Sequence, residues 1–201
     1  VGLHPPLSHQ QAGARMKILP TEIPDVLILE PEVFEDERGF FLESYNKRRF
    51  EEQGIHIEFI QDNHSLSVST GTLRGLHYQL PPRAQTKLVR VLAGSIFDVA
   101  VDLRPDSSTL GQWVGVTLSA ENKQQLLIPK GFAHGFYTLE PNTQVAYKVD
   151  DYYSIEHDRG IRWNDPDIGI SWPSNSPILS AKDETSPYWR QVISEGGGGG
   201  L

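Results

Sequence analysis

The stretch SIFDVAVDL, residues 95–103, decides the fold class because apolar and polar side chains alternate along it. One face takes the apolar residues Phe97, Val99, Val101 and Leu103. Asp98 and Asp102 fall on the other face, which is the period of two that a β-strand produces. Similar short runs, separated by turn residues and with almost no helical periodicity, fill most of the chain. The sequence therefore predicts an antiparallel, all-β sandwich or barrel.

Further strands are predicted on both sides of this stretch. They cover residues 26–29, 40–45, 58–65, 72–78, 87–92, 113–118, 124–128, 132–139 and 143–149. One short helix is predicted over 47–53, with Asn46 as its N-cap and Gly54 after its end. The segment from Tyr152 onward is rich in Pro, Asp, Asn and Trp. We expect it to wrap the sandwich as ordered loop and short helical turns.

Length, charge and composition limit the class of protein. The 201 residues suit one domain, which we place at 16–194, between a disordered N-terminal extension (1–15) and a flexible Gly-rich tail (195–201). The formal net charge of −8 argues against nucleic acid as a partner. The absence of cysteine removes disulfides, thiolate nucleophiles and cysteine metal ligands. The apolar runs are too short to cross a membrane, and we expect a cytoplasmic protein.

The run LRGLHYQ, residues 73–79, carries the first candidate for chemistry. Histidine side chains suit general-base chemistry near neutral pH, so His77 is a candidate base, although a strand histidine also often has a structural role. Arg74 and Lys87 would suit an anionic substrate and a developing oxyanion. In a regular strand Arg74 and His77 point to opposite faces. If both enter one pocket, the strand must be irregular, and we predict a β-bulge or twist at Gly75.

Two histidine motifs resemble those of the cupin superfamily. The first is Gly71, five residues, then His77, and the second is Pro129-x-Gly131-x-x-His134. The resemblance implies a jelly-roll barrel with its site inside the barrel mouth. A metal-binding cupin has His-x-His in the first motif and a glutamate soon after it. Here Gln79 takes the place of the second histidine, and we therefore predict no metal.

The chain is most similar to one cupin family, the dTDP-4-dehydrorhamnose 3,5-epimerases. The resemblance runs from about residue 18 to 189, in the family's order and close to its spacing. The resembling segments include 36–43 (DERGFFLE), 61–65 (QDNHS), 73–79, 87–91 (KLVRV), 98–104 (DVAVDLR), 128–136, 152–153 (YY), 160–166 (GIRWNDP) and 179–183 (LSAKD).

The resemblance implies four catalytic residues and no cofactor. His77 would be the base that abstracts a proton next to a ketone, oriented by Asp183. Tyr147 would be the acid on the opposite face, and Lys87 would stabilise the enolate. The absence of a GxGxxG fingerprint agrees with chemistry that needs no hydride transfer.

The resemblance also implies substrate-binding residues. These are Arg38, Glu43, Gln61, Asp62, Asn63, Arg74, His134, Asp158 and Lys182. Arg38 and Arg74 would hold the pyrophosphate, since a guanidinium binds two phosphate oxygens at once. In the family, the segment with Arg38 and Glu43 reaches the neighbouring subunit's site, which implies a homodimer.

Three departures from the family pattern affect the expected substrate fit. The loop 65–71 is one residue longer than usual, Asp158 replaces a common glutamate, and Ser154-Ile155 replaces a proline-containing turn. None of them touches the expected base or acid.

The hypothesis is a cofactor-independent epimerase that inverts carbons 3 and 5 of dTDP-4-dehydro-6-deoxy-D-glucose to give dTDP-4-dehydro-L-rhamnose. One alternative is epimerisation of a related dTDP-4-keto sugar at a single carbon. A second is a metal-dependent cupin oxygenase using His77 and His134, and a third is a non-catalytic sugar-binding cupin.

Overall fold

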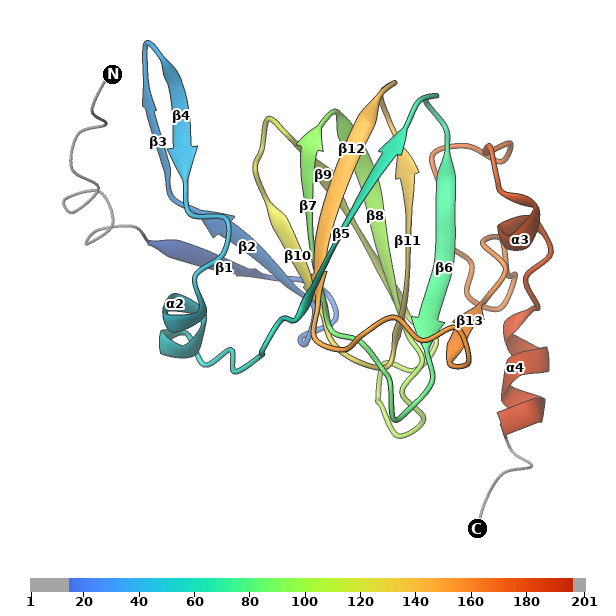
Figure 1. The fold of residues 1–201 in the computed structure, drawn as a ribbon. Helices are drawn as coiled ribbons and strands as arrows, with labels where there is room; N and C mark the ends of the chain where they lie inside the picture. The colour runs from blue at the N-terminus through green and yellow to red at the C-terminus, as the bar shows by residue number, and fades with distance from the viewer. Residues whose placement is uncertain (1–14, 197–201) are drawn as a thin grey trace.

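The protein, seen as a computed structural model that describes residues 15–196, is built from two antiparallel sheets packed face to face (Figure 1). The six-stranded sheet consists, in spatial order, of β1 (Met16–Pro20), β2 (Leu27–Pro31), β10 (Gln125–Ile128), β7 (Lys87–Ala93), β12 (Thr143–Val149) and β5 (Gln61–Ser67). The five-stranded sheet consists of β13 (Asp158–Gly160), β6 (Leu73–Gln79), β11 (Phe132–Thr138), β8 (Ser95–Asp102) and β9 (Trp113–Ser119). The predicted all-β, cupin-type jelly roll with few short helices is confirmed.

A third, two-stranded sheet stands apart from the others. It is the hairpin of β3 (Val33–Asp36) and β4 (Gly39–Leu42), and it projects from the body on the side away from α3 (Ala181–Glu184) and α4 (Trp189–Gly196) (Figure 1). The side chains of Phe40 and Phe41 on this hairpin are exposed.

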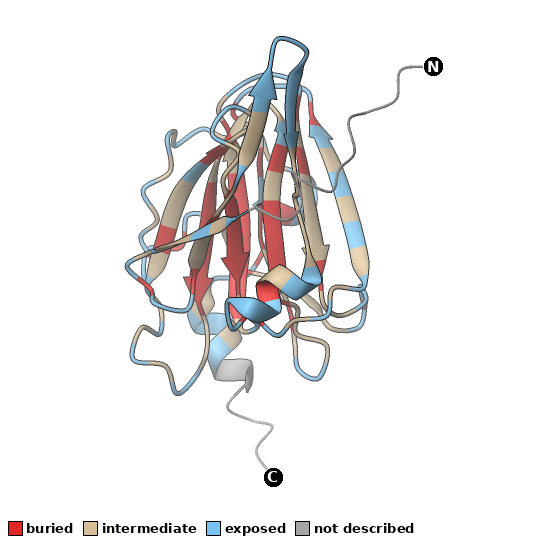
Figure 2. Ribbon diagram, turned by 90° about the vertical axis from the view of Figure 1, so that its left-hand side faces the viewer, coloured by how far each residue is buried: buried red, intermediate tan, exposed pale blue. Residues whose placement is uncertain are grey.

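The core lies between the two large sheets, where the strands are coloured as buried in Figure 2. Both sheets contribute branched aliphatic side chains to it, including Ile96, Leu118, Leu126, Ile128 and Val145. Burial of each side chain of this size stabilises the folded state by about 1.5–3 kcal/mol relative to leaving it exposed. This apolar packing holds the two sheets together.

The alternating residues 95–103 do not separate a buried face from an exposed one. Both faces of β8 are buried. Val99 and Val101 pack under the carboxyl-terminal segment, beside Ile168 and Trp172. Asp98 and Asp102, on the other face, have no exposed surface at all. The expected wrapping of the carboxyl segment around the sandwich therefore covers the outer face of this strand.

Most predicted elements are present, with shifted ends. Helix α2 (Lys47–Glu52) begins after Asn46, whose side chain accepts from Arg49 N, and Gly54 follows its end with a φ of 81°. The strand expected at 58–65 is β5, which starts only at Gln61. Strands β1, β3 and β13 were not predicted, because their three to five residues carry too little alternation to register.

The expected terminal segments fall mostly outside the described residues. Residues 1–14 and 197–201 are not described, so a disordered extension and a flexible tail stay predictions, as do the limits of the single domain. Arg15 pairs with Glu32 through its backbone, and α4 extends to Gly196. No helix among residues 15–196 is long and apolar enough to cross a membrane.

Candidate active site

A cavity of about 420 Å³ opens between the two sheets, and all four predicted catalytic residues line it. Its lining consists of Ser65, Thr72, Leu73, Arg74, His77, Lys87, His134, Phe136, Tyr147, Ile178, Leu179, Ser180, Lys182 and Asp183. Lys87 and Tyr147 come from the six-stranded sheet, and His77 and His134 come from the five-stranded sheet. Groups from opposite walls can therefore face one bound molecule.

A bulge in β6 brings Arg74 and His77 into this cavity together. Arg74 pairs with Phe136 of β11 and His77 pairs with His134, so Gly75 and Leu76 both lie opposite one residue. This extra residue puts the side chains of Arg74 and His77 on the same side of the strand. The predicted irregularity at Gly75 is confirmed.

Only glycine fits at the bulge. Gly75 has a φ of 128°, and a Cβ there would lie 2.6 Å from Gly135 Cα and 2.7 Å from His134 O. The Gly75 N–H points instead at Asp183, donating to Oδ2 over 3.1 Å. The bulge therefore shapes the cavity and also binds the carboxylate that lies behind the histidine.

His77 and Asp183 form a hydrogen-bonded pair. His77 Nε2 lies 2.6 Å from Asp183 Oδ1, and the Asp183 side chain is almost fully buried. Burial by itself raises the pKa of Asp183, but the hydrogen bond from His77, the His77 and Lys182 charges and the Gly75 N–H together lower it below its ordinary value. An ionised Asp183 holds a proton on Nε2, which leaves Nδ1 as the His77 nitrogen that can accept one.

Helix α3 places Asp183 through its cap. The Ser180 hydroxyl accepts a hydrogen bond from Asp183 N over 3.1 Å, and the neighbouring Lys182 donates to Asp158 Oδ2 over 2.6 Å. Both contacts fix the start of a four-residue helix that has few bonds of its own. The hydrogen bond to Asp158 also raises the pKa of Lys182.

Lys87 is a buried cation in the lining of the cavity. Its residue is 8 % exposed, and its ammonium makes no hydrogen bond or ion pair with any residue that the structure describes. Burial lowers its pKa from 10.5 to about 8, against the opposing charges of Asp98 and Asp158. Lys87 Nζ lies 5.9 Å from the centre of the Tyr147 ring. A desolvated, fixed cation of this kind interacts strongly with an oxyanion.

Tyr147 and His134 complete the walls. Burial is the main cause of the raised pKa of Tyr147, so its phenol stays protonated at neutral pH. His134 is buried, and its Nε2 lies 2.5 Å from Asp98 Oδ1. Burial is the main cause that lowers the pKa of His134; the charge and hydrogen bond of Asp98 oppose it, and the charges of Lys87 and His77 add to it, so the imidazole stays neutral at neutral pH.

Other predicted binding residues lie beside the cavity. Gln61 and Asn63 share an inward face of β5 and bond to each other over 2.9 Å. Asp158 accepts a hydrogen bond from Lys182, which lines the cavity. These three residues therefore surround the opening without lining it.

Three predicted residues are not brought into the cavity of their own chain. Asp62 points to the other face of β5, where it accepts from Lys148 over 2.9 Å, because strand side chains alternate. Arg38 pairs with Asp36 on the β3–β4 hairpin, and Glu43 pairs with Arg49 over 2.7 Å. Their roles in binding stay predictions.

Sequence reasoning missed two groups of residues. Seven residues line the cavity without having been proposed for the site: Ser65, Thr72, Leu73, Phe136, Ile178, Leu179 and Ser180. Asp98 lies behind His134 and has no exposed surface. The position of a carboxylate between Phe97 and Val99 in a mostly apolar strand was the available signal for Asp98. A Ser-x-x-Asp cap was the signal for Ser180.

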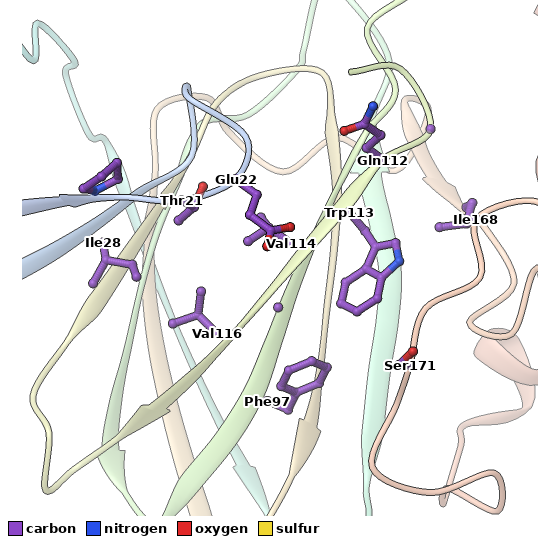
Figure 3. A pocket seen from close by; sticks show the side chains of 13 residues that line it. Thr21, Glu22, Ile28, Phe97, Gln112, Trp113, Val114, Val116, Ile168 and Ser171 are labelled. Atoms are coloured by element: carbon purple, nitrogen blue, oxygen red, sulfur yellow. The ribbon is translucent and has the colours of Figure 1, made fainter. Parts of the chain in front are cut away.

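A larger hollow of about 830 Å³ runs along the outer strand β9 (Figure 3). Its lining includes the apolar side chains of Phe97, Trp113 and Val116, and Glu22 is the single carboxylate among the described residues that line it. Among the described residues that line it there is no histidine, lysine or arginine. No group of three or more His, Asp or Glu side chains in residues 15–196 is placed to hold a metal ion.

Comparison with known proteins identifies the family of this chain. The family model for dTDP-4-dehydrorhamnose 3,5-epimerase matches residues 20–191. The dTDP-4-dehydrorhamnose 3,5-epimerase of Shigella flexneri is 59 % identical over 169 residues, which are 84 % of this chain and 93 % of the relative.

Two solved structures show the same fold. The epimerase from Bacillus anthracis, with TDP and PPi bound, is 56 % identical with a TM-score of 0.85, covering 87 % of this chain and 99 % of that chain. The dTDP-6-deoxy-D-glucose-3,5-epimerase from Legionella pneumophila, in complex with dTDP-4-keto-L-rhamnose, is 50 % identical with a TM-score of 0.86, covering 90 % and 96 %. This chain belongs to the dTDP-4-dehydrorhamnose 3,5-epimerase family.

Proposed function

We propose that the cavity between the sheets inverts carbons 3 and 5 of dTDP-4-dehydro-6-deoxy-D-glucose, giving dTDP-4-dehydro-L-rhamnose. The observation that carries the proposal is the His77–Asp183 pair on one wall, facing Tyr147 on the other, with Lys87 buried nearby. Both carbons lie next to the ketone, so both C–H bonds are acidified by the same carbonyl group.

Each inversion needs a base and an acid on opposite faces of the sugar ring. His77 Nδ1 takes the proton from carbon, and the electron pair moves to the carbonyl oxygen as an enolate. Asp183 stabilises the imidazolium that forms. Tyr147 then gives a proton from the opposite wall, at carbon 5, which reverses the configuration. No electrons are gained or lost, and the proposal therefore needs no cofactor.

Lys87 has the role of stabilising the enolate. The ammonium is desolvated before substrate arrives, and an oxyanion beside it would replace the hydration that the lysine lost on folding. Fixed charges in such sites typically contribute about 3–4 kcal/mol to the barrier. Because its pKa is about 8, Lys87 still carries its charge at neutral pH.

The proposed substrate class rests on the cationic lining and on the relatives. Arg74 and Lys182 line the cavity and suit the pyrophosphate of a nucleotide sugar. The Legionella relative was solved with dTDP-4-keto-L-rhamnose and the Bacillus relative with TDP and PPi. We propose further substrate contacts from Gln61, Asn63, His134 and Asp158. Asp62, on the outer face of β5, stays a proposed substrate-binding residue.

The proposal includes a cytoplasmic homodimer. Arg38 and Glu43 lie on and just after a hairpin that projects away from the body of its own chain (Figure 1). The Arg38 side chain is 66 % exposed and its neighbour Phe40 is 60 % exposed. A second copy of the chain would accept this hairpin at its own cavity and bury the aromatic residues.

Incubation with dTDP-4-dehydro-6-deoxy-D-glucose in deuterated water, followed by proton NMR, tests the function. We expect deuterium at carbons 3 and 5 and, with a coupled 4-keto reductase, dTDP-rhamnose. Exchange at carbon 3 alone would establish the single-carbon alternative. A stoichiometric transition metal in the purified protein, with activity lost to a chelator, would replace the proposal by metal-dependent chemistry.

A further inference from the structure

Gln79 is a buried amide at the end of the strand that carries His77. It is 5 % exposed and is two residues after His77, so both side chains project to the same side of β6. A primary amide that is removed from water has to satisfy two N–H donors and a carbonyl oxygen within the protein. The partners of such a group show what it holds in place.

The partners of Gln79 all belong to loops outside β6. Its Nε2 donates to Arg83 O over 2.7 Å and to Tyr152 O over 3.2 Å. Its Oε1 accepts from Ser154 N over 2.8 Å. One side chain thereby joins three backbone positions on two loops that are about 70 residues apart in sequence.

The segment joined in this way, residues 150–158, is here called the rim loop. Within it, Tyr153 N donates to Gln61 Oε1 over 3.1 Å, and Tyr153 Oη lies 3.5 Å from Asp158 Oδ2. Asp158 also accepts from Lys182, which lines the cavity. The position of the rim loop therefore fixes polar groups at the opening of the cavity.

Gln79 is one of two deeply buried attachments of the rim loop, the other being Thr86 N, which donates to Asp150 Oδ1 over 2.6 Å. Arg83 and Gln85 reach Asp151 over 3.0 and 2.9 Å from more exposed positions. Without Gln79, two carbonyl groups and one N–H of these loops lose their partners. A carboxylate in its place would put negative charge against the Arg83 and Tyr152 carbonyl oxygens. The arrangement is specific for an amide.

We propose that Gln79 is a positioning residue that holds the rim loop against β6 and thereby sets the affinity for the nucleotide sugar, leaving the proton-transfer step unchanged. The inference rests on the proposed function and concerns the same site. It predicts a larger KM at a constant kcat when the amide is replaced.

The main test compares Gln79→Met with Gln124→Met. The first keeps the length of the side chain and loses all three hydrogen bonds. The second removes a single bond, from Gln124 Nε2 to Glu30, at a distance from the cavity. We expect KM and the Kd for dTDP to rise about tenfold in Gln79→Met, with kcat within about threefold of wild type, since the loops lose all three of their hydrogen bonds to this side chain. The control Gln124→Met should have the KM, the kcat and the Kd for dTDP of the wild type.

The result that overturns the inference is a folded Gln79→Met with unchanged KM, or with reduced kcat at an unchanged KM. If this variant does not fold, Gln79→Glu takes its place, because it keeps the size and the bond from Ser154 N. The wild type gives a further test, since dTDP should slow hydrogen exchange at Tyr153 and Ser154. Absence of that protection contradicts the inference.

Failure of the proposed function is a separate result. A wild-type protein that binds dTDP but exchanges no sugar protons would refute the epimerase. The Kd values and the hydrogen exchange would still decide the role of Gln79.

Discussion

His77 and Asp183 are 106 positions apart in the chain, yet His77 Nε2 lies 2.6 Å from Asp183 Oδ1. The contact depends on two features far apart in sequence. The bulge at Gly75 turns His77 into the cavity, and the Ser180 cap sets Asp183 behind it. This pair determines which imidazole nitrogen is available to act as a base.

Replacing either member of the pair should slow catalysis by different routes. His77→Asn removes the base, and kcat should fall by about 10²–10⁴ while dTDP still binds. Asp183→Asn keeps the size but no longer holds the proton on Nε2, and kcat should also fall by at least about 10². Single-turnover rates and dTDP titration check both. A loss of dTDP binding equal to the loss in rate would contradict the assignment.

Tyr147→Phe should separate exchange from inversion. His77 would still remove protons, but no acid on the opposite wall would complete the inversion at carbon 5. We expect turnover to fall by about 10² or more, with deuterium exchange persisting at carbon 3 in proton NMR. Tyr78→Phe is the control, because the Tyr78 hydroxyl is buried without a hydrogen-bond partner among the described residues. Equal effects of both changes would exclude Tyr147 as the acid.

The pKa of Lys87 predicts how activity depends on pH. Lys87 loses its proton above about pH 8, so kcat should decline there. The pKa of Tyr147 is raised above its ordinary 10, so loss of the phenol proton comes later. Lys87→Met should be nearly inactive at every pH. An alkaline decline that begins only above about pH 10 would contradict the role of Lys87.

The same pKa also predicts how stability depends on pH. Below about pH 8 the folded and unfolded chains both hold the Lys87 proton, and the burial cost is present in full. Between about pH 8 and the unfolded value of 10.5, the unfolded chain binds more protons, so stability rises with pH. Relative to Lys87→Met, the wild type should gain about 3 kcal/mol over this window. The free energy of unfolding in urea, measured for both proteins at about pH 8 and about pH 10.5, checks this gain. A difference between the two proteins that does not change with pH would contradict the buried cation.

Gly75→Ala should destabilise the fold far more than Gly39→Ala. Both glycines have similar positive φ values, 128° and 132°. A Cβ at Gly39 meets nothing within 4 Å, whereas one at Gly75 would collide with the Gly135 and His134 backbone. We expect Gly39→Ala to cost about 1–2 kcal/mol and Gly75→Ala several kcal/mol more. Similar unfolding free energies for both would mean that the bulge is not tightly packed.

Mixed dimers test whether Arg38 acts in the partner's site. His77→Ala and Arg38→Ala subunits are each inactive alone if both residues are needed. In a mixed dimer the cavity of the Arg38→Ala subunit has its own His77 and receives an intact Arg38 from the His77→Ala subunit. Random mixing should restore about a quarter of wild-type activity. Activity that stays at the level of the separate variants would place Arg38 in its own subunit's site or outside catalysis.

The sequence by itself determined the all-β class, most strands, the α2 cap and the conflict between Arg74 and His77 that requires a bulge. These features depend on neighbours a few residues apart: alternation with period two, a capping side chain, a glycine in a strand. Resemblance to a known family supplied candidate residues, but not their distances.

Only the tertiary structure decided which candidates meet. Asp183 reaches His77, and Asp98 reaches His134, through strand pairing and packing between distant segments. The same packing buries both faces of β8, gives Lys87 its lowered pKa and makes Gln79 an anchor for a loop some 75 residues away. Burial and partner geometry are properties of the folded chain, and local sequence pattern carries no record of them.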